Sequence, residues 1–131
     1  MAGIGSRRPV RNLYLPGIHF PVGAVVSILH RVSGMVLALL LPVSLWALQQ
    51  SLAGAESYAQ LRQLLQGQPA RVLVVLFLVI MAHHLLAGVR HLLQDVDLGI
   101  SRAGGRVGAW LVLAGVLTVA AFAGYFIIIA P

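Results

Sequence analysis

The sequence predicts an all-α integral membrane protein with three transmembrane helices, and three observations support this prediction. Hydrophobic residues make up 60% of the 131 residues and charged residues only 9%, too few to cover a soluble domain. Long apolar runs occupy residues 25–48, 70–93 and 107–130. Each exceeds the roughly 20 residues that a helix needs to cross a hydrocarbon core of about 30 Å. The runs lack the two-residue alternation of barrel strands, so we expect helices.

The segments between the apolar runs predict two smaller features. Residues 57–66 carry apolar side chains at helical spacing, which predicts a short helix lying at the membrane interface. Gly104 and Gly105 predict a short turn before the third run. No internal repeat divides the chain, so we expect one domain over residues 1–131. The stretch before Pro21 has no apolar core, so no cleaved signal peptide is expected.

The distribution of cations predicts the orientation in the membrane. The net charge of +6 comes from nine arginines, without lysine, against three acidic residues. Most arginines flank the start of the first run or the segment between the second and third runs: Arg7, Arg8, Arg11, Arg31, Arg90, Arg102 and Arg106. By the positive-inside rule these segments face the cytoplasm and the C-terminus faces the other side. Arginines at helix ends can pair with acidic lipid headgroups. Nucleic-acid binding would instead need the positive charges gathered on one solvated face.

The second run, with the sequence MAHHLLAGVRHLLQD, contains the ionisable residues that indicate chemistry. Such residues are costly in lipid and are functional candidates by default. Four residues share one helical face: His84, Gly88, His91 and Asp95. A neutral imidazole at the depth of His84 suits axial ligation of a haem iron, and Gly88 leaves room for a porphyrin. An interhelical hydrogen bond is the alternative role for His84, and His83, on a neighbouring stripe, is the rival ligand.

The first run opens with VVSILHRVSG, in which another set of residues shares a face: Ser27, His30, Arg31 and Gly34. The hydroxyl, imidazole and guanidinium groups together can bind an anion or a polarised carbonyl. Alternatively, Arg31 extends to the headgroups and Ser27 bonds to its own helix. No further histidine lies deep in an apolar run, so this chain can supply only one axial ligand. A haem with two histidine ligands would therefore need a second protein chain. The chain has no cysteine, which excludes thiolate ligands.

Three segments together resemble the succinate dehydrogenase cytochrome b subunit family. They are the pair Arg8-Pro9, FPVGAVVSILHRVSG at residues 20–34, and HLLAGVRHLLQD at residues 84–95. In that family S-x-x-H-R-x-[ST]-G opens the first helix and H-x-x-x-G-[IV]-R-H ends the second. The resemblance extends over essentially the whole chain, although the third span matches only in hydrophobicity. Gln94 departs from the family pattern, which has an apolar or aromatic residue there.

The resemblance implies a membrane-anchor (C) subunit of succinate:ubiquinone oxidoreductase, respiratory complex II, which links the tricarboxylic acid cycle to electron transport. Its three helices would form half of a heterodimeric six-helix anchor bundle in the bacterial inner membrane, with a cytoplasmic N-terminus and a periplasmic C-terminus. The implied partners are a flavoprotein subunit, an iron–sulfur subunit, a second anchor (D) subunit and membrane lipid. Succinate would be oxidised in the partner subunits, so no catalytic residue for that step is expected here.

The resemblance also implies roles for individual residues. His84 matches the axial ligand of haem b, with the second axial histidine supplied by the D subunit, so the implied metal is haem iron. His30, Arg31 and His91 match positions near the haem propionates, and Ser27 and Arg31 match residues of the ubiquinone site. Asp95 matches an acidic position associated with proton delivery.

Two other interpretations stay open from the sequence. The anchor of a fumarate reductase shares the architecture but runs electrons from quinol to fumarate. A non-redox membrane protein that binds a metal through His83 and His84 is the other. Adjacent residues point about 100° apart on a helix and therefore chelate poorly, which argues against the metal site.

Overall fold

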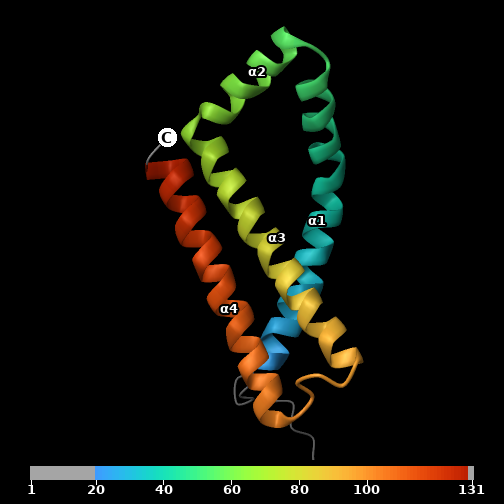
Figure 1. Cartoon of the computed structure of the whole chain (residues 1–131). Helices are drawn as coiled ribbons and strands as arrows, with labels where there is room; N and C mark the ends of the chain where they lie inside the picture. The colour runs from blue at the N-terminus through green and yellow to red at the C-terminus, as the bar shows by residue number, and fades with distance from the viewer. Residues whose placement is uncertain (1–19, 130–131) are drawn as a thin grey trace, which may run out of the picture.

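The computed structural model describes residues 20–129, and these residues form helices without any strand (Figure 1). The elements in order are α1 (Val22–Leu52), α2 (Ala55–Gln66), α3 (Gln68–Asp95), α4 (Arg102–Gly124) and a short π-helix, η2 (Tyr125–Ile129). Three helical stretches are long and apolar enough to cross a membrane: α1, α3, and α4 continued by η2. The predicted three-span helical fold is confirmed. Arg7, Arg8, Pro9, Arg11 and His19 lie outside the described residues.

The spanning helices extend beyond the predicted apolar runs at most of their ends. Runs predicted at 25–48 and 70–93 correspond to helices Val22–Leu52 and Gln68–Asp95. Apolar composition marks the part of a helix that lies in lipid, whereas backbone hydrogen bonding continues into the polar ends. Pro69 stands in the first turn of α3, where its missing N–H costs nothing.

The predicted turn at Gly104 and Gly105 is wrong, because both residues lie in the first turn of α4. Ser101 is the N-cap of this helix, and its Oγ accepts a hydrogen bond from the Gly104 N–H at 3.0 Å. The chain reverses in the preceding loop, where Asp97 and Gly99 adopt left-handed φ values of 62° and 75°. A Cβ on Gly104 would lie only 3.0 Å from the Cα of Gly99. Gly104 therefore allows a close backbone approach between the first turn of α4 and the loop before it.

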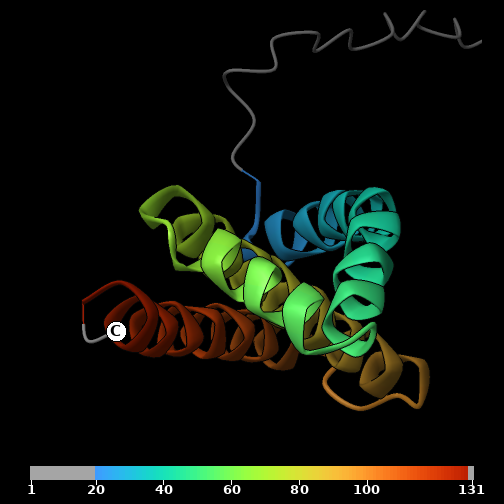
Figure 2. The ribbon, with the colours of Figure 1, turned by 90° about the horizontal axis from the view of Figure 1, so that it is seen from above.

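The bundle is closed at one end, where α1 and α3 cross, and these two helices separate toward the other end (Figure 1). α1 and α3 cross near the end of α3, and α4 packs along α3 (Figure 1). Away from the crossing, α1 and α3 diverge, and α2 lies between their far ends (Figure 2). The apolar core sits at the crossing and consists of small and medium side chains: Val26, Ala87, Ala109 and Val112. Small residues let helix backbones approach closely in a membrane, which explains where this core forms.

Candidate functional site

Three histidines gather where α1 and α3 cross. The imidazole of His30, on α1, stacks on that of His84, on α3, with ring centroids 4.3 Å apart and planes inclined by 8°. The ring of His91 lies 5.2 Å from that of His30 at an angle of 54°. The cross-helix grouping therefore joins the two motifs that the sequence placed on separate helices.

Hydrogen bonds from α1 fix the orientation of the His84 ring. Its Nδ1 lies 3.2 Å from the carbonyl oxygen of His30 and 3.2 Å from Oγ of Ser33. The Ser33 hydroxyl donates its one hydrogen to the same carbonyl at 2.9 Å. Both neighbours of Nδ1 then act as acceptors, so this network assigns the ring proton to Nδ1. In a neutral imidazole Nε2 consequently keeps a free lone pair.

Two glycines create the space in which these rings lie. A Cβ on Gly34 would stand 2.9 Å from Cε1 of His84, closer than side chains tolerate. A Cβ on Gly88 would stand 3.3 Å from Nε2 of His30. The notch at Gly88, which we expected to clear a porphyrin, thus receives the His30 imidazole. Both glycines serve the contact between α1 and α3.

The adjacent histidines of α3 have different surroundings. His83 is only 7% exposed, and its Nε2 has no hydrogen-bond partner within residues 20–129. His84 is partly exposed at the surface of the helix pair. The described part of the chain contains no group of three or more His, Cys, Asp or Glu residues that holds a metal. A metal bound by His84 would therefore need ligands from outside residues 20–129.

The remaining predicted site residues lie at the same end without contacting the cluster through hydrogen bonds. Ser27 is partly buried near the start of α1, and Arg31 and Asp95 are exposed. None of the side-chain hydrogen bonds within residues 20–129 involves these three residues. The described chain thus brings His30, His84 and His91 together, whereas Ser27, Arg31 and Asp95 have no side-chain hydrogen bond within residues 20–129.

Comparison with known proteins identifies the family. The sequence matches the succinate dehydrogenase/fumarate reductase transmembrane subunit family over residues 6–123. The chain belongs to this family. It is also 40% identical over 110 residues to the succinate dehydrogenase cytochrome b556 subunit of Coxiella burnetii (strain RSA 493 / Nine Mile phase I), covering 83% of this chain and 87% of that one. The predicted resemblance is confirmed, and the chain is a multi-pass membrane-anchor subunit of this enzyme class.

In this anchor subunit, Ser33 is the site residue that the sequence reasoning missed. It is 7% exposed and bonds both to the His30 carbonyl and to His84. A signal for it was available, since Ser33 follows His30 by three residues and precedes Gly34 in the first motif. A buried hydroxyl requires hydrogen-bond partners, and Ser33 finds them in two histidines that belong to different spanning helices.

Proposed function

We propose that this anchor subunit binds haem b together with a second anchor subunit and forms part of the ubiquinone-reduction site of a succinate:ubiquinone oxidoreductase. One observation carries the proposal. The Nδ1 of His84 lies 3.2 Å from the carbonyl oxygen of His30, and with the proton assigned to Nδ1 this contact orients the ring and leaves Nε2 free for iron. Metal-ligating histidines characteristically donate their other ring N–H to a carbonyl or carboxylate in this way.

The surroundings of the two histidines favour His84 over His83 as the axial ligand. A haem shared between two chains has to lie at a surface open to the partner, and His84 is partly exposed whereas His83 is buried. The second axial histidine would come from the D subunit. His30, His91 and Arg31 lie at the same end and would hold the propionates. When bound, the haem would supply a one-electron carrier beside the quinone site.

Ser27 and Arg31 would hold the quinone near the start of α1. They stand one helical turn apart on the same face, on the histidine side of the bundle. The Arg31 guanidinium would stabilise negative charge developing on a quinone oxygen, and the Ser27 hydroxyl would donate a hydrogen bond. The exposed carboxylate of Asp95, with His91 one turn away, would organise water that delivers protons.

The orientation follows from the arginines. We infer that the end containing the histidines faces the cytoplasm of a bacterial inner membrane and that the C-terminus faces the periplasm. The flavoprotein and iron–sulfur subunits would dock at the cytoplasmic end and deliver electrons from succinate. Among the enzymes of the family, the 40% identity to a succinate dehydrogenase subunit favours succinate oxidation over fumarate reduction.

Purification of the native complex through a tag on this chain tests the assignment. The flavoprotein and iron–sulfur subunits should co-purify, and the reduced-minus-oxidised spectrum should be that of a bis-histidine b-type haem. An intact complex without porphyrin and without quinone reductase activity would overturn the proposal.

Substitutions at the quinone site test it separately from the haem. Ser27→Ala and Arg31→Gln should each lower succinate:quinone reductase activity by about tenfold or more. Succinate oxidation with an artificial acceptor should stay unchanged, because that step occurs in the partner subunits. Arg62→Gln, which removes an exposed arginine of α2 at the far end, is the matched control. Unchanged quinone turnover in the first two variants would remove those residues from the site.

A further inference from the structure

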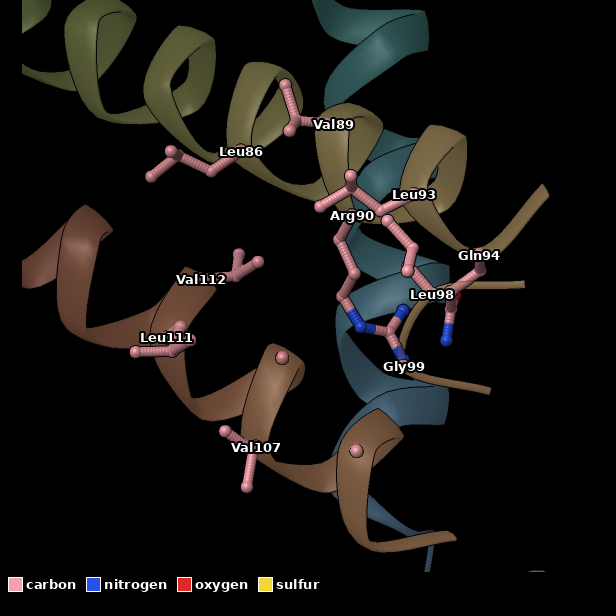
Figure 3. Close-up of a pocket in the computed structure, with 12 residues that line it drawn as sticks. Leu86, Val89, Arg90, Leu93, Gln94, Leu98, Gly99, Val107, Leu111 and Val112 are labelled. Carbon is pink, nitrogen blue, oxygen red and sulfur yellow. The ribbon is translucent and has the colours of Figure 1, made fainter. Parts of the chain in front are cut away.

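A second region with ligand-binding character lies on the opposite side of α3 from the histidine cluster. A cavity of about 350 Å³ opens between the end of α3 and the start of α4 (Figure 3). Most of its wall is apolar, and its residues include Leu86, Val89, Leu93, Leu98, Val107 and Leu111. The cation in this wall is Arg90, whose guanidinium points from α3 toward Gly99 in the loop before α4 (Figure 3). The cavity therefore combines one positive charge with a hydrocarbon surface.

Glycines of two neighbouring helices leave room for the Arg90 side chain. A Cβ on Gly108 would lie 3.4 Å from Nε of Arg90, and a Cβ on Gly23 would lie 3.3 Å from Nη2. Nη2 donates to the carbonyl oxygen of Gly105 at 3.3 Å. The guanidinium thus has a defined position at the mouth of the cavity, in a slot between α1 and α4.

This interaction leaves the charge of Arg90 without an anion. Its Nε is buried and has no hydrogen-bond partner, and no carboxylate bonds to the guanidinium within residues 20–129. Arg90 stands about 8 Å along the axis from the end of α3, at 1.5 Å per residue. That position is at the edge of the hydrocarbon core, where a desolvated cation is costly unless an anion pairs with it.

We propose that this cavity binds one anionic phospholipid of the adjoining leaflet, with its phosphate on Arg90 and an acyl chain along α3 and α4. A phosphate can accept hydrogen bonds from the Nη1 and Nη2 groups of Arg90, of which only Nη2 has a partner within residues 20–129, and the acyl chain covers the apolar wall. A peptide segment fits less well, since its backbone would need hydrogen-bond partners that a wall of leucine and valine does not provide. The lipid site is separate from the proposed haem and quinone site, because it lies on the side of α3 that packs against α4 and not on the side with the histidine cluster.

Lipid retention by the purified whole complex tests the proposal. Complexes are reconstituted in nanodiscs containing phosphatidylglycerol and phosphatidylcholine, returned to mild detergent, and analysed by native mass spectrometry. The parent complex should retain one phosphatidylglycerol in preference to phosphatidylcholine, and Arg90→Gln should lower that retention roughly tenfold. Arg106→Gln is the matched control, since it removes an exposed arginine of the same membrane face that does not line the cavity. Equal losses in the two variants, or equal retention of both lipids, would overturn the proposal.

A second pair of variants keeps Arg90 and alters only the apolar wall. Leu111→Trp should fill the acyl part of the cavity and lower phosphatidylglycerol retention. Leu117→Trp, on the same helix and outside the wall, should not. The two leucines are similarly exposed, at 66% and 70%, so they are matched. If the Arg90 variant fails to assemble, this pair decides the question. Capture of a partner subunit instead of lipid by a photo-crosslinker at Leu111 would also overturn the proposal.

Discussion

The two ends of the helix bundle are built from different residues. At the crossing, contacts are made by small or polar residues, among them Ser33, Gly34, His83, Ala87 and Ala109. At the far end α1 and α3 separate, α2 bridges them, and a cavity of about 630 Å³ lies between the three helices. Its wall consists largely of bulky apolar side chains, including Leu40, Val43, Trp46, Leu64, Leu73 and Phe77.

This difference shows how the anchor subunit concentrates its chemistry. Lipid gives helices no hydrophobic reason to associate, so association depends on close packing and on interhelical hydrogen bonds. Glycine, alanine and serine permit close packing, and serine also forms interhelical hydrogen bonds. Ser33, Gly34 and Ala87 lie beside the histidines of the crossing. Apart from the Ser44 hydroxyl, the cavity at the far end is lined by apolar side chains, which suits contact with lipid or with another apolar helix.

The largest expected effect belongs to the ligand at the crossing. His84→Ala should abolish the b-type haem spectrum of the complex, because this imidazole is the axial ligand that the chain is proposed to supply. His83→Leu should retain the spectrum, because that imidazole points into the buried bundle. Reduced-minus-oxidised optical spectra of the two purified complexes measure whether the b-type haem is present. Retention in the first variant with loss in the second would reassign the ligand.

Glycine-to-alanine substitutions compare the two ends directly. Gly34→Ala should lower haem occupancy several-fold, because the new methyl would lie 2.9 Å from Cε1 of His84 and displace the ring. Gly124→Ala, at the far end of α4, meets no atom within 4 Å and should leave occupancy unchanged. The haem-to-protein ratio of each complex measures the effect. Equal occupancy in both variants would mean that the ring is not confined by Gly34.

Serine-to-alanine substitutions should produce a smaller change. Ser33→Ala removes one acceptor from the Nδ1–H of His84, worth about 1 kcal/mol, which reduces the basicity of the ligand. The haem should remain bound, and its midpoint potential should rise by about 40 mV at most. The matched control is Ser44→Ala at the far end, where the hydroxyl bonds only to its own helix. Redox titration measures both, and an equal shift in the control would contradict a positioning role for Ser33.

The smallest effect is expected for truncation at the far end. Leu64→Ala shortens a side chain that is 59% exposed and should change stability by no more than about 0.5 kcal/mol. Val112→Ala removes two methyl groups from a core residue that is 4% exposed, and it should lower the stability of the complex by a larger amount. Thermal midpoints of the two complexes provide the comparison. A larger loss at Leu64 would show that the far end is tightly packed in the assembled complex.

Several features of the fold could be predicted because they depend on nearby residues only. The length of an apolar run determines whether a helix spans the membrane, and α1, α3 and α4 follow from it. Residues 57–66 formed the helix that their spacing predicted. The start of α4 was missed because glycines predicted a turn, whereas the Ser101 cap and the approach of Gly99 to Gly104 favoured a helix.

For the candidate site, the sequence by itself determined which residues share a face, because the helical period orders His84, Gly88, His91 and Asp95. Only the tertiary structure decided what that face meets. The bonds from His84 to Ser33 and His30 join residues 51 and 54 positions apart, and the stack with His30 crosses the same interface. The slot around Arg90 likewise takes glycines from two other helices. Helical periodicity fixes directions around one axis, whereas the neighbour in each direction depends on how separate helices pack.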